Sequence, residues 1–253
     1  MTGRDLPGYA VDDDTVIWRY MSRDRIRGLL GGHLYFAAAH QFDDAFEGAI
    51  TDGAQRRRVA EAARLFPNDL DDQSHWLRQL STAFEQLRHL TKINCWHMSR
   101  YENVAMWERY TRSSPAAVAV VSTVGALKRS LGEFRLQPTF GTETIYVGEV
   151  KYVDYLVEVG EGFMLEAFFR KRVEYRDEAE VRVALSLRMA EEFGVAVPAD
   201  GVFVDVDVAS LFSRVIASPW ATATDVGILR DIVGAAGVPG AVGESALVRR
   251  PTY

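Results

Sequence analysis

The chain has 253 residues, of which 48% are hydrophobic and 25% charged, the proportions of a folded globular protein. These proportions exclude whole-chain disorder, a collagen-like fibre and a disulfide-rich scaffold. A net charge of −6 disfavours a nucleic-acid-binding protein of the usual basic kind, and the single cysteine excludes an intramolecular disulfide and a cysteine-rich zinc site.

Certain sequence patterns would direct the chain to a membrane or out of the cell. The N-terminal residues contain no apolar signal core, and nowhere do 18 apolar residues run together. We therefore expect a cytoplasmic protein that makes no membrane contact. Cys95 lies in an apolar run and is interpreted as a structural thiol.

Strands and helices alternate in the first part of the chain. Residues 16–21 predict a strand, and Ser22 is a suitable N-cap for a helix through Leu30. A second strand is predicted over 33–37, before an acidic segment at 41–48.

A long helical segment follows, over about residues 54–90, broken near Pro67. Leu77, Leu80, Phe84 and Leu87 recur at spacings of three and four, which predicts a stripe that faces the core. We interpret this segment as a helical insertion.

The rest of the chain predicts further short elements. Strands are expected over 92–98, 116–122, 144–153, 179–187, 202–207 and 214–217, and helices over 103–111, 124–131, 161–172 and 224–236. Residues 116–122 form a continuous run of small apolar side chains, typical of a strand buried on both faces. The pattern predicts one α+β domain over residues 1–253, with a mixed, mainly antiparallel sheet flanked by helices.

Four blocks occur together in a fixed order: Ile17–Ser22, Leu34–Gly48, Cys95–Tyr110 and Glu178–Arg182. Their order and spacing resemble the bacterial domain of unknown function 2971 family over residues 15–220. The blocks are specific in combination, and each alone is weak. This resemblance implies a fold but no activity.

A second resemblance has chemical content. Trp18-Arg19 in the first strand, a helix that ends at Gly31-Gly32, a second strand and a late Glu180 occur in the order typical of ADP-ribosyltransferases. The resemblance implies an enzyme that uses NAD and a macromolecular acceptor, protein or nucleic acid, as in a bacterial toxin or a phage-defence effector. Oligomeric state and genetic partner stay open.

The resemblance makes Glu180 the catalytic carboxylate, which would stabilise the oxocarbenium-like charge as nicotinamide leaves. Glu178 lies two residues earlier, on the same strand face if the strand already runs there, and would orient the nucleophile or substrate. The alternative is an exposed polar strand face. On this alternative the two glutamates are surface groups, and Arg182 by itself is interpreted as a surface charge.

Arg19 and Tyr20 are the predicted NAD-holding residues of the first strand. The fork of Arg19 would bind a pyrophosphate or ribose, and Tyr20 would stack on the nicotinamide ring. The alternatives are an exposed strand arginine and a core tyrosine. Trp107 and Tyr110, three residues apart, would form an aromatic wall for NAD, and core packing is the alternative.

The acidic turn has three interpretations. Asp44 as N-cap with Glu47 three residues later would form a variant capping box at a helix start. Asp43, Asp44 and Glu47 would otherwise bind ribose hydroxyls, or hold a divalent metal together with the two later glutamates. The metal interpretation gives an alternative function, a metal-dependent nuclease.

A third class of function is a non-catalytic sensor or interaction protein of a defence system. The basic clusters of the chain, Arg56–Arg58, Arg170–Arg172 and Arg249-Arg250, are interpreted as solvated helix faces or a tail. A nucleic-acid groove is the alternative for them.

Overall fold

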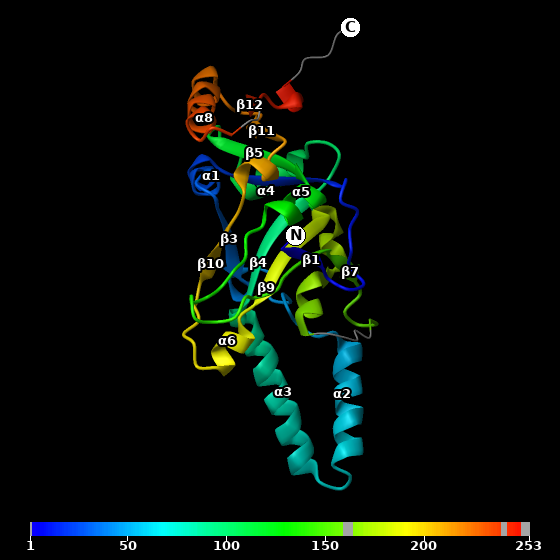
Figure 1. Cartoon of the computed structure of the whole chain (residues 1–253). Coiled ribbons are helices and arrows are strands. Elements are labelled where there is room, and N and C mark those ends of the chain that lie inside the picture. The colour runs from blue at the N-terminus through cyan, green and yellow to red at the C-terminus, as the bar shows by residue number, and fades with distance from the viewer. Residues whose placement is uncertain (1, 159–163, 239–241, 249–253) are drawn as a thin grey trace.

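A ten-stranded, mostly antiparallel sheet organises the chain, which the structure, a computed structural model, describes over residues 2–158, 164–238 and 242–248 (Figure 1). Its strands are β1 (Gly3–Asp5), β2 (Val16–Ser22), β3 (His33–Ala38), β4 (Thr91–Met98), β5 (Ala117–Thr123), β6 (Ile145–Glu149), β9 (Glu180–Ser186), β10 (Gly201–Asp205), β11 (Arg214–Ala217) and β12 (Val242–Gly243). The main path runs β1-β6-β9-β4-β2-β5-β11-β12, and β3 joins β10 to β4. A separate parallel pair is formed by β7 (Lys151–Val153) and β8 (Arg170–Arg172).

Helices flank this sheet, so the predicted α+β fold class is confirmed. They are α1 (Arg23–Leu30), α2 (Asp52–Leu65), α3 (Leu70–Leu90), α4 (Val104–Thr111), α5 (Val124–Ser130), α6 (Arg188–Glu192), α7 (Val208–Leu211) and α8 (Ala223–Ala235). The 3-10 turns are η1 (Ala39–Gln41), η2 (Met164–Phe169), η3 (Val173–Glu178) and η4 (Ala246–Val248). The side chain of Ser22 accepts a hydrogen bond from the backbone N–H of Arg25, as its predicted N-cap role requires.

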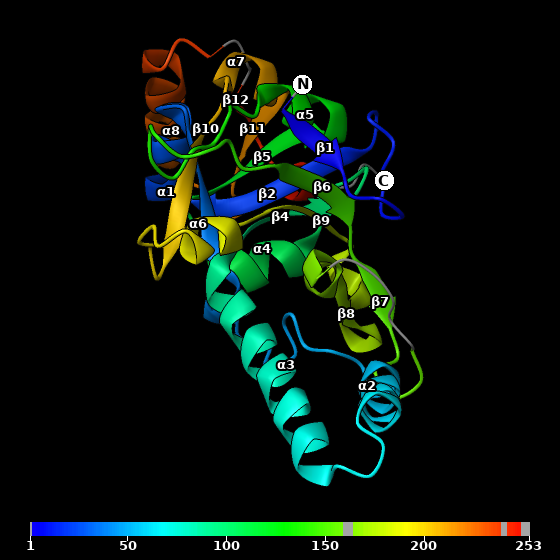
Figure 2. The same cartoon turned by 60° about the horizontal axis from the view of Figure 1, so that its bottom comes forward.

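The helices α2 and α3 form a hairpin that projects from the sheet (Figures 1 and 2). Of the four residues in the predicted stripe of α3, only Leu87 is buried, and Leu77, Leu80 and Phe84 are half-buried. Because most of the hairpin extends beyond the sheet, its apolar stripe has little to pack against except α2.

One predicted helix is wrong. Residues 164–169 form η2, and Arg170–Arg172 form β8, which pairs with β7; positions 159–163 lie outside the described residues. The backbone pairing with β7 replaces the helical hydrogen bonds that the local sequence favours. The predicted strand over 144–153 likewise divides into β6 and β7.

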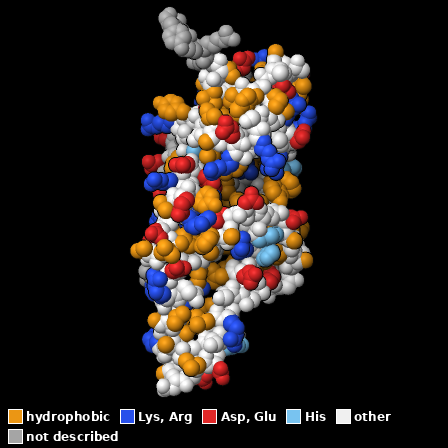
Figure 3. All heavy atoms as spheres, turned by 180° about the vertical axis from the view of Figure 1, so that it is seen from behind, with side chains coloured by type: hydrophobic (Ala, Val, Ile, Leu, Met, Phe, Trp, Pro, Cys, Tyr) orange, Lys and Arg blue, Asp and Glu red, His pale blue; other side chains and the backbone are white. Residues whose placement is uncertain are grey.

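The two faces of the sheet differ in chemistry. Along β9, Val181 and Val183 pack into the main apolar core, whereas Glu180 and Arg182 point to the opposite face. Both faces are buried at this point, because helices or turns cover each of them. A charged strip therefore lies inside the molecule, while the surface in Figure 3 intersperses acidic, basic and apolar side chains.

Candidate functional site

The two candidate catalytic glutamates lie where β9 begins. Glu180 opens the strand opposite His97 of β4, and Glu178 ends η3, before the strand. Ala179 between them has a left-handed conformation with φ of 38°. The strand does not yet run at Glu178, so the condition for a shared strand face is not met, but this turn still brings the two carboxyl groups within hydrogen-bond reach of each other.

Two cations hold these carboxylates in place. Nζ of Lys171 lies 2.5 Å from Oε2 of Glu178 and 3.3 Å from Oε1 of Glu180. Nε of Arg182 lies 2.6 Å from Oε2 of Glu180. The guanidinium of Arg182 also donates to both carboxylate oxygens of Glu47, at 2.5 and 3.0 Å. We call these five residues the carboxylate cluster.

The carboxylate cluster is buried. Arg182 has no exposed surface, and Glu47, Glu178, Glu180 and Lys171 expose between 1% and 7%. Charges removed from water are costly unless they are paired and hydrogen-bonded, and here each charge has a partner of opposite sign. The interpretation of Arg182 as a surface charge is therefore wrong.

The two glutamates differ in protonation. Burial raises the pKa of Glu178, and the hydrogen bond and charge of Glu180 raise it further. Burial also opposes ionisation of Glu180, but the charge of Arg182 and the hydrogen bond from Glu178 hold the pKa of Glu180 below its usual value. The pair thus separates into a group that binds its proton up to about pH 7 and a group that stays ionised.

Half-exposed side chains of α4 cover the solvent side of the carboxylate cluster. Arg109 donates to Glu178, with nearly half of its side chain exposed. Tyr110 is 47% exposed, yet burial of its hydroxyl and the charge of Glu180 raise the pKa of Tyr110. Arg109 therefore joins the buried carboxylate of Glu178 to a half-exposed side chain of α4.

Neutral donors and acceptors complete the surroundings of the two glutamates. The backbone N–H of Glu180 donates to the Tyr152 hydroxyl at 2.9 Å. Nδ1 of His97 lies 2.7 Å from the carbonyl oxygen of Glu178, and burial lowers the pKa of this histidine. A neutral imidazole that donates from Nδ1 fits both observations.

The aromatic residues predicted for NAD lie on the same face of the sheet. Tyr20 and Trp107 are buried with ring centroids 4.9 Å apart, and the Tyr20 hydroxyl accepts from the backbone N–H of Asn103. The Tyr20 ring lies 6.4 Å from that of His97. Tyr20 and Trp107 therefore pack in the core beside the carboxylate cluster, and Tyr110 alone of the predicted aromatic set is exposed.

Arg19 lies between strands rather than on the charged face. β2 and β4 pair only at their Ile17–Met98 and Trp18–His97 positions and then separate. Nη1 of Arg19 enters this gap and donates to the carbonyl oxygen of Cys95 at 2.5 Å. The guanidinium thus satisfies a carbonyl that no neighbouring strand reaches, and contact with NAD stays a prediction for this residue.

The acidic turn does not begin a helix, so the predicted capping box is wrong. Asp44 accepts from the backbone N–H of Phe46 in a local turn, and α2 begins later with Thr51 as its N-cap. Gly48, with φ of 72°, turns the chain so closely over Phe168 that a Cβ would lie 2.3 Å from its ring. This turn delivers Glu47 to Arg182 instead.

The two aspartates of the turn differ in exposure. Asp43 is exposed, and the buried carboxylate of Asp44 lies 3.5 Å from the guanidinium of Arg172. Among the described residues, no three histidine, cysteine, aspartate or glutamate side chains form a group that could hold a metal ion. Lys171 and Arg182 instead occupy the positions beside the carboxylates that a metal would need.

Sequence reasoning missed the role of three cations. Lys171 was placed on a helix and Arg182 on the surface, and Arg109 was not singled out. A usable signal was present in β9, where Arg182 follows Glu180 on the same face of a strand with a continuous apolar partner face. A strand of this kind is buried, and a buried arginine requires carboxylates.

In comparisons with protein-family models, curated proteins and solved structures, the chain matches none of them. Within the described ranges, no helix combines the length and apolar character needed to cross a membrane. Any assignment of function therefore depends on the site itself.

Proposed function

We propose that this chain is an ADP-ribosyltransferase-like enzyme that cleaves NAD, with Glu180 as its catalytic carboxylate and Glu178 as the partner acid–base group. The observation that carries the proposal is the pair of adjacent carboxyl groups whose surroundings push their pKa values in opposite directions. Pairs of this kind are a common feature of catalytic sites, where they define which group is the acid or base.

The chemistry requires an ionised and a proton-accepting group. As the bond between ribose C1′ and the nicotinamide nitrogen breaks, the nitrogen takes the electron pair and positive charge develops on the ribose. The carboxylate of Glu180, held ionised by Arg182, would stabilise that charge. The acceptor nucleophile attacks C1′ and gives up a proton, which Glu178 would take in its ionised form, since a pKa raised to about 7 leaves part of this group ionised near neutral pH.

The approach to these groups lies beside α4. Arg109 and Tyr110 are the half-exposed residues next to the buried pair, so the ion pair between Arg109 and Glu178 would open as NAD enters. Glu178 would keep a cationic partner after Arg109 moves away, because Lys171 also pairs with it. Tyr110 would then lie against the nicotinamide or ribose.

The proposal includes the finer expectations from the sequence. These are membership of the domain of unknown function 2971 family, a cytoplasmic location, a role as a toxin or phage-defence effector, and a protein or nucleic-acid acceptor.

The test measures nicotinamide release from NAD by the full chain, with and without cell protein and with nucleic acid as acceptors. Glu180→Gln should reduce release at least 100-fold, a typical loss for a group that stabilises developing charge. Glu178→Gln should reduce transfer to the acceptor. Glu192→Gln is the matched control, since Glu192 forms an exposed ion pair with Arg188 outside the site.

Glu180 also supports the fold, so loss of activity in Glu180→Gln could reflect unfolding. Tyr110→Ala therefore provides an independent test of NAD binding. This half-exposed residue holds no ion pair of the carboxylate cluster, so Tyr110→Ala should keep the thermal midpoint and raise the KM for NAD. The proposal is overturned if folded wild-type protein neither binds NAD in calorimetry nor releases nicotinamide with any acceptor. It is equally overturned if folded Glu180→Gln retains full activity.

A further inference from the structure

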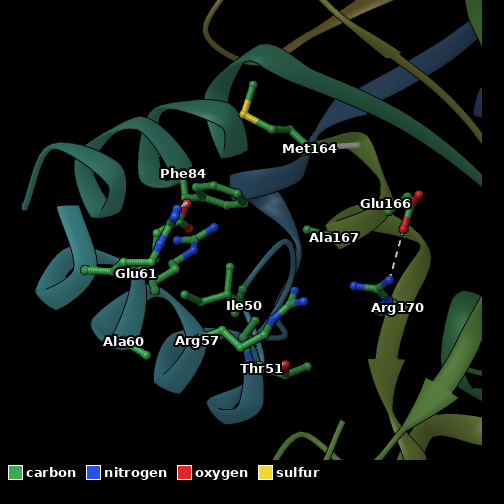
Figure 4. Close-up of a pocket in the computed structure, with 14 residues that line it drawn as sticks. Ile50, Thr51, Arg57, Ala60, Glu61, Phe84, Met164, Glu166, Ala167 and Arg170 are labelled. Atoms are coloured by element: carbon green, nitrogen blue, oxygen red, sulfur yellow. Dashed lines mark hydrogen bonds and ion pairs between the residues drawn. The ribbon is translucent and has the colours of Figure 1, made fainter. Parts of the chain in front are cut away.

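A cavity of about 550 Å³ lies between the helical hairpin and the segment that carries η2 and β8. Its charged lining is dominated by arginines, namely Arg57, Arg58, Arg64 and Arg170, and we call it the arginine cavity. Figure 4 shows Arg57 of α2 and Arg170 of β8 pointing into the same space from opposite walls. None of the sequence-predicted site residues lines it.

Basic side chains predominate in the described part of this lining. Four arginines face two glutamates there, in a protein whose net charge is −6. Each of these glutamates has a cation beside it: Glu166 lies 3.0 Å from Arg170, and Glu61 lies 3.9 Å from Arg64. Neither carboxylate therefore pairs with Arg58.

Arg58 shows how the cavity holds this charge. Its guanidinium lies 4.1 Å from the ring centroid of Phe84 on α3, and the described residues place no carboxylate within ion-pair distance of it. The aromatic face fixes the orientation of the guanidinium without neutralising it. Arg58 therefore presents an oriented fork of donors without a carboxylate partner.

We propose that the arginine cavity binds a small molecule that carries two or more phosphate groups, of the class of a nucleoside diphosphate. Guanidinium forks match the geometry of phosphate oxygens, and arginines on two walls would engage two phosphate groups of one ligand. The cavity volume lies in the range of ordinary small-molecule sites, about 300–1,000 Å³.

This site is separate from the proposed catalytic pair, although the two share a strand. Along β8, Arg170 lines the cavity and its neighbour Lys171 binds Glu178 and Glu180. Binding in the cavity therefore needs no NAD cleavage. It should persist in folded Glu178→Gln, so failure of one proposal is distinguishable from failure of the other.

The test is calorimetric titration of the full chain with pyrophosphate and with ADP. Arg58→Gln and Arg64→Gln should each weaken binding about 10- to 100-fold, the usual loss for a charge-assisted hydrogen bond. Arg58→Lys keeps the charge but loses the fork, so it should bind more weakly than wild type. Arg56→Gln is the matched control, since Arg56 precedes these residues on α2 but donates to the carbonyl oxygen of Leu156 outside the cavity.

Three outcomes would overturn the proposal. The first is the absence of binding of both probes to folded wild-type protein at concentrations of about 1 mM. The second is binding that Arg58→Gln and Arg64→Gln leave unchanged, which would place the ligand elsewhere. Binding of an RNA oligonucleotide without binding of pyrophosphate or ADP also overturns it, because a polymer surface would then replace a small-molecule site.

Discussion

The carboxylate cluster and the arginine cavity lie on opposite sides of β8 and treat charge in opposite ways. In the carboxylate cluster, three glutamates pair with two cations, and all five side chains are almost completely out of contact with solvent. In the described lining of the arginine cavity, arginines outnumber glutamates and stay in contact with open space. Arg170 and Lys171 are neighbours on one strand, yet the first lines the cavity and the second belongs to the buried cluster. A basic residue type alone therefore does not determine whether the side chain is buried in ion pairs or faces open space.

The comparison predicts that the same residue type has very different energetic weight in the two regions. Arg182→Leu removes the cation shared by Glu47 and Glu180 and leaves two buried carboxylates without it. The free energy of unfolding should fall by about 3–5 kcal/mol, the usual cost of breaking a buried ion pair from one side. Urea denaturation measures this loss, and a loss below about 1 kcal/mol would show that the carboxylate cluster is not closed as described.

The closure itself is tested at Gly48, which has φ of 72° and almost no space for a side chain beside Phe168. Gly48→Ala should cost about 2–4 kcal/mol, because a left-handed alanine is strained and its methyl group overlaps the ring. Gly8→Ala supplies the control, since Gly8 also has a positive φ, 79°, but a Cβ there meets nothing within 4 Å. Equal losses at the two glycines would mean that backbone strain alone, and not contact with Phe168, explains the effect.

The sequence predicts the features that depend on interactions between residues close together in the chain. The cap at Ser22, the strand over 179–187 and the buried run of β5 depend on neighbours within a few residues, and all three predictions are confirmed. The wrong predictions depend on distant partners. Glu47 turns inward to pair with Arg182, which lies far along the chain. Arg170–Arg172 forms a strand because β7 pairs with it.

The candidate site shows the same division. Sequence order brought Tyr20, Trp107, Tyr110, Glu178 and Glu180 into consideration, and the structure places all five on or beside one face of the sheet. The cations that hold the glutamates were not predicted, because their role depends on register between strands that no local pattern specifies. The arginine cavity was missed as well, since it forms only when the hairpin and η2 come together.

The split protonation of the carboxylate cluster gives a pH prediction. The pKa of Glu178 is raised from its ordinary value of 4.5, so the folded state retains this proton at a higher pH than the unfolded chain. Its stabilising contribution is complete below pH 4.5 and is lost as the pH rises through the raised pKa. Glu178→Gln removes this titration, so its stability relative to wild type should increase with pH from 4.5 upward, on the order of 1 kcal/mol. A difference independent of pH between the two denaturation series would contradict the raised pKa.

The smallest effect is expected in the arginine cavity, where Arg64 is exposed and its ion pair with Glu61 spans 3.9 Å. Arg64→Gln should change the free energy of unfolding by less than about 0.5 kcal/mol in the absence of ligand, as is usual for an exposed side chain. Urea denaturation of Arg64→Gln and of Arg182→Leu under the same conditions compares the two losses of unfolding free energy directly. If Arg64→Gln instead destabilised the protein as strongly as Arg182→Leu, the arginines of the cavity would serve the fold. A side chain that the fold does not need for its stability is available to bind a ligand, which is the condition that a binding site requires.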